Sequence, residues 1–246
     1  MARTDYSTPR LCVDDDLELG RPIPLKAEAA NYLVNVLRLR PGARVLAFNG
    51  RDGEFAATLD AEKKRAALTP FEKLRAQETA PPLDYLFAPL KHARLDYMAQ
   101  KAVEMGVRSL RPVLTRRTQV ARLNLERLEA NAIEACEQCG VIWRPEIHAP
   151  VSLDAALDAW PSDRLLVFCD EDADLANPLD ALRAAPDAAG VGLLIGPEGG
   201  FEAGERAALL RLPNVLRLNL GPRILRADTA AVAALALLQA RFGDWT

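Results

Sequence analysis

Short apolar runs separated by polar turns dominate the first 75 residues, a pattern typical of β-strands rather than of long helices. Two such runs flank Asn49-Gly50-Arg51-Asp52, and an Asn-Gly step there favours a tight hairpin because both residues tolerate positive φ. Strands are expected at residues 10–13, 43–49 and 53–59, and a helical segment at residues 27–39. The pattern predicts a small, β-rich domain over residues 1–75.

The pattern changes after Pro81-Pro82, a pair that cannot continue a helix or a central strand. From Leu83 onward, short apolar runs alternate with segments of helical period. Strands are expected at residues 83–89, 109–114, 165–169, 191–195 and 215–220, and helices at 95–105, 124–139, 178–185, 203–212 and 229–242. Strands alternating with helices of this length are typical of a parallel sheet covered by helices. The sequence therefore predicts an α/β domain over residues 76–246.

Composition narrows the class of protein. With 246 residues, 50% of them hydrophobic and 26% charged, the chain is an ordinary globular protein rather than a disordered or collagen-like one. A formal net charge of -3 excludes a polycation that holds nucleic acid by bulk charge alone. No apolar run approaches the roughly 18 residues of a membrane span, and charged residues near the N-terminus argue against a signal peptide. We therefore expect a cytoplasmic protein with no membrane partner.

Cysteine and histidine are too few for a disulfide scaffold or a catalytic zinc site, so no metal is expected. Cys136 and Cys139 have the spacing of a metal or redox pair. No second pair accompanies them, and they fall within a helical segment, which favours helix packing over metal binding.

Charge is distributed unevenly along the chain. Residues 91–127 contain nine Lys or Arg against three acids, whereas residues 146–187 contain ten acids against two Arg. A basic stretch of this kind suits a polyanion, and a solvated helix face is the equal alternative.

The segment from Val191 to Phe201 carries the clearest chemical signal. An apolar strand enters a loop with three Gly and one Pro before the next helix, which leaves backbone amides bare at the carboxyl edge of a parallel sheet. This is where α/β proteins bind ligands, although a strand-to-helix turn that merely requires positive φ is the alternative. The sequence has neither the P-loop motif that binds nucleoside triphosphates nor the glycine-rich motif that binds dinucleotide cofactors. Another ligand is therefore indicated.

A second such segment runs from Leu218 to Ala230. A strand ends in Gly-Pro, and a polar cluster then opens an Ala-rich helix. Asp228 or Thr229 could simply cap that helix. Arg223 and Arg226 instead suggest a clamp for a phosphate or a nucleobase, because the guanidinium presents a planar fork of donors.

These two loops resemble those of a known family, the bacterial RsmE proteins, which are small-subunit rRNA methyltransferases of the SPOUT superfamily. The resemblance covers nearly the whole chain and lies in LLIGPEGG (193–200), LGPRILRADTA (220–230), KAVEMG (101–106), EQCG (137–140), VLR (36–38) and FNG (48–50). Three motifs depart from the family pattern: Asn31 replaces His, Val141 replaces Arg, and RADTA (226–230) replaces RTETA, with Asp228 in place of Glu.

The resemblance implies a SPOUT-type α/β methyltransferase domain with a deep trefoil knot, preceded by a PUA-like RNA-binding domain, in a homodimer. It implies that S-adenosylmethionine is the cofactor and that N3 of a uridine in helix 44 of 16S rRNA, in the small ribosomal subunit, is the methyl acceptor. Another SPOUT RNA methyltransferase, acting on ribose 2′-O or on tRNA, and a non-catalytic RNA-binding assembly factor are the alternatives.

The resemblance also assigns roles to residues. Catalysis is expected from Arg226 and Asp228. Cofactor contacts are expected from Leu194, Ile195, Gly196, Pro197, Glu198, Gly199, Gly200, Leu218, Leu220, Gly221, Ile224 and Leu225. Contacts to rRNA are expected from Arg10, Arg38, Lys91, Arg116, Arg117 and Arg223.

Overall fold

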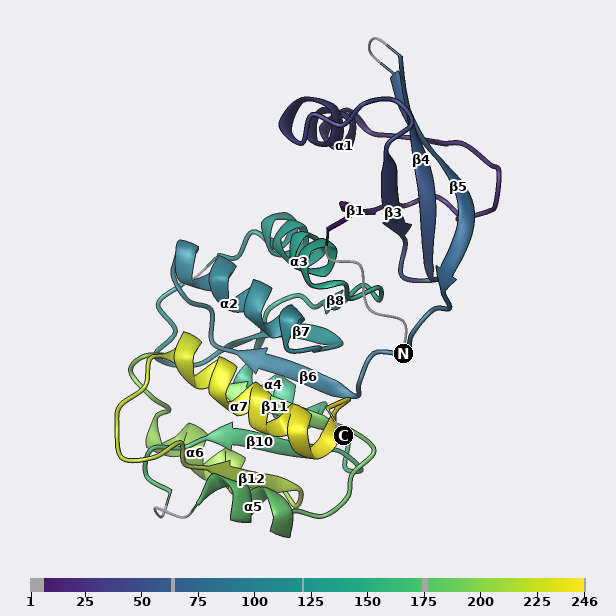
Figure 1. The fold of residues 1–246 in the computed structure, drawn as a ribbon. Helices are drawn as coiled ribbons and strands as arrows, with labels where there is room; N and C mark the ends of the chain where they lie inside the picture. Colours follow the sequence, from purple (N-terminus) through teal and green to yellow (C-terminus); the bar gives the residue numbers. More distant parts are fainter. Residues whose placement is uncertain (1–6, 63–64, 121, 174–176, 246) are drawn as a thin grey trace. The chain divides into compact units, whose positions relative to one another are not determined.

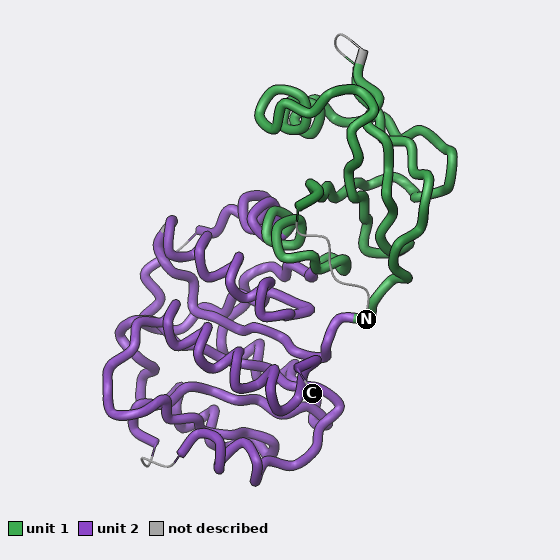
Figure 2. The backbone as a smooth tube through the Cα atoms, in the orientation of Figure 1, with its two compact units in different colours: residues 1–79, 133–144 green, residues 80–132, 145–246 purple. Residues whose placement is uncertain are grey.

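The computed structural model describes residues 7–62, 65–120, 122–173 and 177–245. The chain forms two compact units, residues 1–79 with 133–144 and residues 80–132 with 145–246 (Figure 2). The first unit thus includes the C-terminal half of helix α3 (Leu125–Cys139), which the sequence pattern assigned to the second domain. Hydrogen bonds explain this: the Glu137 carboxylate accepts from Cys12 N at 2.9 Å, and the Gly140 carbonyl accepts from Arg75 Nη2 at 2.9 Å.

The first unit is built on one sheet with the strand order β1-β3-β4-β5-β2 (Figure 1). Its strands are β1 (Arg10–Cys12), β2 (Ile23–Pro24), β3 (Arg44–Phe48), β4 (Glu54–Glu62) and β5 (Arg65–Arg75). The hairpin predicted at Asn49-Gly50 is confirmed, since β3 and β4 pair antiparallel and Gly50 has a φ of 79°. Buried side chains of β3, β4 and β5, among them Val45, Phe55 and Leu68, form the core.

The predicted helical segment at residues 27–39 is shorter in the structure. It consists of α1 (Ala27–Asn31) and the π-helix η1 (Tyr32–Val36). Arg38 stops it, because this residue has a φ of 55°, in the left-handed region that side chains other than Gly rarely adopt.

Arg10 is the one expected rRNA contact that the structure corrects. Its side chain is buried, and Nε donates to Glu54 Oε1 at 2.8 Å. Arg75 Nε donates to the other oxygen of the same carboxylate at 3.0 Å. A guanidinium enclosed in this way is not presented to a phosphate, so Arg10 has a structural role in the first unit.

The second unit is a parallel sheet, as the alternation of strands and helices predicts. The strand order is β12-β10-β11-β6-β7-β8, with β9 paired to β7, and every pair is parallel. The strands are β6 (Leu83–Phe87), β7 (Ser109–Leu114), β8 (Glu146–Ile147), β9 (Val151–Ser152), β10 (Leu165–Cys169), β11 (Val191–Ile195) and β12 (Val215–Leu218). Their carboxyl ends therefore share one edge of the sheet.

Helices cover both faces of this sheet (Figure 1). They are α2 (His92–Glu104), α4 (Leu153–Asp158), α5 (Pro178–Ala184), α6 (Ala203–Leu209) and α7 (Ala227–Phe242), together with the first half of α3. Helix α7 packs on α2, α5 and β11, while α4 packs on α6 and β7 on the other face. After the edge strand β12, the chain thus returns across the sheet as α7, between α2 and α5. Within the described residues, no helix is both long and apolar enough to cross a membrane.

A buried carboxylate ties the amino ends of three strands together. Asp84 of β6 is 1% exposed and accepts from Arg108 Nε at 2.9 Å and from Ser109 Oγ at 2.7 Å, both at the start of β7. It also pairs with Arg164, which directly precedes β10. Burial opposes ionisation of this carboxyl, but the hydrogen bonds from Arg108 and Ser109 outweigh it and lower the pKa of Asp84.

We expect Asp84→Ala to lower the free energy of unfolding by about 3 to 5 kcal/mol, because Arg164 would stay buried without its counter-charge. Urea denaturation followed by circular dichroism measures the change. Asp180→Ala is the control: it breaks an exposed pair with Arg183 and should cost less than about 1 kcal/mol. Equal losses in the two variants would show that the Asp84 network does not stabilise the sheet.

Candidate active site

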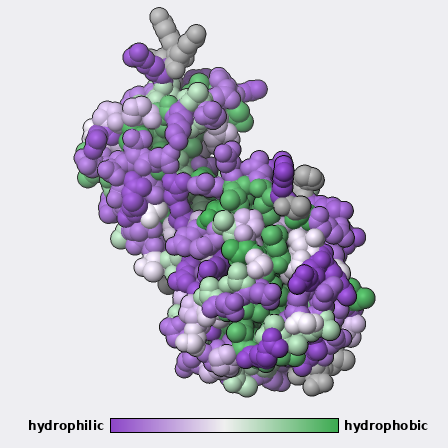
Figure 3. Space-filling model, turned by 180° about the vertical axis from the view of Figure 1, so that it is seen from behind, coloured by the Kyte–Doolittle hydropathy of each residue, from purple (hydrophilic) through white to green (hydrophobic). Residues whose placement is uncertain are grey.

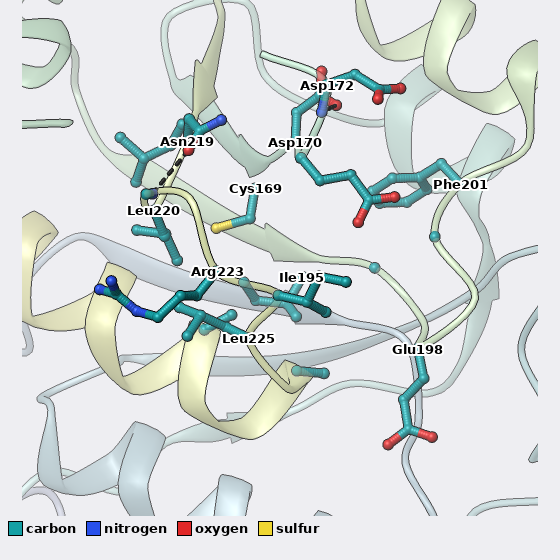
Figure 4. Close-up of a pocket in the computed structure, with 18 of the residues that line it drawn as sticks. Cys169, Asp170, Asp172, Ile195, Glu198, Phe201, Asn219, Leu220, Arg223 and Leu225 are labelled. Atoms are coloured by element: carbon teal, nitrogen blue, oxygen red, sulfur yellow. Dashed lines mark hydrogen bonds between the residues drawn. The ribbon is translucent and has the colours of Figure 1, made fainter. Parts of the chain in front are cut away.

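The loops that follow β11 and β12 meet at the carboxyl edge of the sheet. Together with the end of β10, they enclose a cavity of about 440 Å³ (Figure 4). Ten of the residues expected to bind a cofactor line it: Ile195, Gly196, Pro197, Glu198, Gly200, Leu218, Leu220, Gly221, Ile224 and Leu225. Two walls of the cavity are thus formed by residues that the sequence singled out.

Two expected residues do not line the cavity. Leu194 is fully buried in the core of the second unit, because successive side chains of a strand point to opposite faces and Ile195 takes the side of the cavity. Gly199 lies against Arg117, whose Cδ would be 3.4 Å from a Cβ at this position.

Close packing shapes the first loop. A Cβ on Gly196 would lie 2.8 Å from the ring of Phe201, so a larger residue would require that ring to shift. The Phe201 ring in turn meets Phe168 of β10 edge-on, with 6.1 Å between the centroids. The loop is thereby packed onto the strand beside it.

An asparagine fixes the second loop. Asn219 Oδ1 accepts from Gly221 N at 2.8 Å (Figure 4), and Asn219 Nδ2 donates to the Ala173 carbonyl at 2.9 Å. Gly221 has a φ of 100°, a conformation that favours Gly. The loop after β12 is thus held to the segment after β10.

Asp170, directly after β10, connects both loops. Its carboxylate accepts from Arg217 Nε of β12 at 2.7 Å and from Arg206 Nε of α6 at 3.1 Å. Burial opposes ionisation, but the hydrogen bonds from Arg206 and Arg217 outweigh it and lower the pKa of Asp170. One charged group therefore positions the elements on either side of the cavity.

Sequence reasoning missed the third wall of the cavity, which Cys169 and the acids Asp170, Glu171 and Asp172 form. A signal was present, since these acids directly follow a predicted strand and must lie at the same edge as the two glycine loops. Burial raises the pKa of the Cys169 thiol to about 12, so it stays protonated and unreactive at neutral pH.

The expected catalytic residues lie beside the cavity, at the start of α7. Arg226 is the N-cap residue, and its exposed guanidinium has no hydrogen-bond partner among the described residues. Asp228 lies in the first helical turn, where Oδ1 accepts from Thr229 N at 2.8 Å. The alternative that Asp228 or Thr229 caps the helix is therefore wrong. The Asp228 carboxylate still benefits from the positive end of the helix dipole.

Four of the expected rRNA contacts are exposed in the second unit. Arg223 lines the cavity, and Lys91, Arg116 and Arg117 lie near it. Arg117 Nη1 donates to the Gly199 carbonyl at 2.6 Å, and Arg116 N donates to the Glu205 carboxylate at 2.7 Å. Arg117 thus reaches the loop after β11, as expected for one common edge. Arg38, in the first unit, is also exposed.

Cys136 and Cys139 lie on α3, and neither forms a disulfide. Burial strongly raises the pKa of Cys136, whose Sγ donates to the Trp143 carbonyl. Among the residues that the structure describes, no group of three or more His, Cys, Asp or Glu is arranged to hold a metal ion.

We expect Asp170→Asn to lower the free energy of unfolding by about 1.5 to 3 kcal/mol at pH 7, because two hydrogen bonds to a charged acceptor are weakened. The folded pKa of Asp170 is below its unfolded value of about 3.9, so its contribution is complete above that pH and is lost as the pH falls through the folded pKa. The difference between parent and variant should therefore shrink below about pH 4. Urea denaturation at several pH values measures it, with the exposed Asp172→Asn as control. A difference independent of pH would contradict the charged clamp.

Known families match both units of the chain. Residues 77–239 match the family described as RNA methyltransferase domain, and residues 25–71 match RNA methyltransferase PUA domain. The ribosomal RNA small subunit methyltransferase E of Rickettsia conorii is 29% identical over 232 residues, which are 94% of this chain and 92% of the relative.

Solved structures of related proteins agree with these family matches. The ribosomal RNA small subunit methyltransferase E of Neisseria gonorrhoeae, bound to S-adenosyl methionine, has a TM-score of 0.86 at 28% identity, with 97% of this chain and 100% of that chain covered. A methyltransferase of Legionella pneumophila with bound cofactor SAM has a TM-score of 0.81 at 31% identity, with 95% of this chain and 97% of that chain covered. The SPOUT-type α/β fold after a small PUA-like domain is therefore confirmed. The chain belongs to the RNA methyltransferase family of the ribosomal RNA small subunit methyltransferase E proteins.

Proposed function

We propose that this protein transfers the methyl group of S-adenosylmethionine to N3 of a uridine in helix 44 of 16S rRNA, in the small ribosomal subunit and in the cytoplasm. The observation that carries the proposal is the cavity that the loops LLIGPEGG and LGPRILRADTA form together at the carboxyl edge of the sheet. The Neisseria and Legionella relatives, which match nearly the whole chain, are bound to this cofactor.

The residues of the cavity suit the cofactor. Its volume of about 440 Å³ is within the range of small-molecule sites, roughly 300 to 1,000 Å³. Ile195, Leu218, Leu220 and Leu225 supply apolar contact for an adenine ring, and the loop amides supply polar contact. The acids after β10 place negative charge at a site whose ligand carries a cationic sulfonium. The cofactor, when bound, supplies an activated methyl group.

The protein must hold uridine N3 in line with that methyl group, about 3 to 3.5 Å away, and must favour the deprotonated base. The two carbonyls beside N3 gain negative charge as its proton leaves. Arg226, exposed at the rim and without a partner among the described residues, is our candidate donor to them. Asp228, two residues further on, either accepts the proton or orients Arg226.

The basic side chains around the cavity would hold the RNA. Lys91, Arg116, Arg117 and Arg223 are exposed at the same edge as the glycine loops, where they suit the phosphates on either side of the target nucleotide. Arg38, in the PUA-like unit, would bind a further phosphate. Arg10 is left out because Glu54 neutralises it in the interior.

The second unit carries apolar surface that suits a homodimer. Ile224, at the rim of the cavity that it helps to line, is 96% exposed. On the face shown in Figure 3, a band of hydrophobic side chains runs over this unit, whereas the first unit is mostly hydrophilic. Surface of this kind is typical of association sites, and we propose a second copy of the chain as the partner.

Mapping the methyl groups of 16S rRNA from a strain that lacks the gene tests the function. We expect one N3-methyluridine in helix 44 to disappear and to return with the parent gene. An intact mark, or a lost methyl group on a ribose 2′-O or in tRNA instead, would refute the proposed acceptor.

Arg226→Ala should lower the single-turnover rate of methyl transfer by roughly 10² to 10³, the range for removal of one donor that acts on developing charge. The affinity for S-adenosylmethionine, measured by calorimetry, should hardly change. Arg211→Ala removes another exposed guanidinium and is the control. A transfer rate equal to the parent's would exclude Arg226 from catalysis.

Replacing both Arg116 and Arg117 with Ala should flatten the plot of log RNA affinity against log salt by about 1.4 to 1.8 units, at roughly 0.7 to 0.9 per phosphate contact. Filter binding at several salt concentrations measures the slope. Replacing Arg183 and Arg211 removes the same charge elsewhere and should leave the slope unchanged. A parental slope in the Arg116/Arg117 variant would contradict the phosphate contacts.

A further inference from the structure

A second cavity, of about 350 Å³, adjoins the first and shares Pro197 and Glu198 with it. The remaining residues of its lining come from the segment after β6, the start of α2 and the segment after β7: Pro89, Leu90, Lys91, Ala93, Arg94, Arg117, Gln119 and Val120. Any group bound there lies beside the first cavity, with the Pro197-Glu198 segment between the two.

The lining of this cavity is basic. Lys91, Arg94 and Arg117 face a single carboxylate, that of Glu198. Arg117 donates to the Gly199 carbonyl at 2.6 Å, which leaves its charge uncompensated. Arg94 forms an ion pair with Glu198. The cavity therefore attracts an anion. The Glu198 carboxylate, the single acidic group among its lining residues, already pairs with the Arg94 guanidinium.

The pair between Arg94 and Glu198 is accessible to exchange. The Arg94 side chain is 38% exposed and the Glu198 side chain 49% exposed, so solvent screens their attraction. Figure 4 shows the Glu198 carboxylate directed away from the first cavity, although the residue forms part of its wall. A guanidinium binds carboxylate and phosphate with the same fork of donors.

We propose that Glu198 occupies the place of an RNA phosphate at Arg94. In the RNA-free protein, the Glu198 carboxylate pairs with the Arg94 guanidinium. When RNA binds, a backbone phosphate next to the acceptor nucleotide enters the second cavity and replaces the carboxylate. This inference rests on the proposed function for the presence of RNA as substrate. The displaced Glu198 is then free to turn toward the first cavity.

The test is the RNA affinity of Glu198→Gln, measured without cofactor on an unmodified 16S rRNA transcript. Removal of the competing carboxylate should tighten binding about two- to fivefold, the range for an exposed ion pair. Glu171→Gln is the matched control: it removes an acid from the same edge, and Glu171 has no ion pair among the described residues. It should change affinity less.

A second experiment uses the variant Arg94→Ala. Arg94→Ala should weaken RNA binding, and in that background Glu198→Gln should no longer tighten it, because the carboxylate then has nothing to block. Circular dichroism establishes that each variant is folded. Unchanged or weaker binding by Glu198→Gln, equal tightening by Glu171→Gln, or the same tightening with Arg94 absent would each overturn the proposal.

Methyl transfer by the parent protein separates this inference from the proposed function. If the parent methylates the transcript but Glu198→Gln does not bind it more tightly, the exchange is refuted and the function stands. If the parent does not methylate the transcript or intact small subunits, the proposed function fails, whatever the binding data show.

Discussion

The candidate active site depends on the carboxylate of Asp170. This group directly follows β10, the strand between β12 and β11, and accepts hydrogen bonds from Arg217 of β12 and Arg206 of α6. The first arginine precedes the loop at residues 219–226, and the second follows the loop at residues 196–202. A single buried charge thus sets the width of the cavity between two loops that are far apart in sequence.

A second buried carboxylate serves the opposite edge of the same sheet. Asp84 joins the amino ends of β6, β7 and β10 through Arg108, Ser109 and Arg164, far along the strands from the cavity. The parallel sheet therefore has a charged clamp at each edge, one beside the glycine loops and one that only supports the fold. Because both carboxylates remain ionised, each keeps its arginines at fixed positions.

Much of this architecture could be predicted because parallel strands have a simple signature. Continuous apolar runs between segments of helical period predicted β6, β7, β10, β11 and β12. The carboxyl ends of parallel strands must then share one edge of the sheet. The strand β5 was missed because its buried Ala66 and Leu68 are followed by Pro70 and by the charged Glu72 and Lys73, which hide the period of a strand. The pattern along the chain cannot show that the end of α3 belongs to the first unit, since hydrogen bonds from Cys12 and Arg75 decide it.

Charged residues were the hardest to interpret from sequence. Arg10 and Arg117 are the same residue type, yet Arg10 is buried in an ion pair with Glu54, whereas Arg117 is exposed beside Gly199. Asp170 likewise has the sequence context of a solvated acid. Only the tertiary structure shows which partner each charge meets, and so which of them remain available for RNA.

The central claim is that the two glycine loops and the end of β10 hold the methyl donor. A crystal structure of the protein with S-adenosylmethionine tests it most directly. The account predicts the cofactor in the cavity of about 440 Å³, against the backbone of residues 195–200 and 218–225, with its methyl group toward Arg226. Cofactor bound elsewhere on the chain, with this cavity empty, would contradict it.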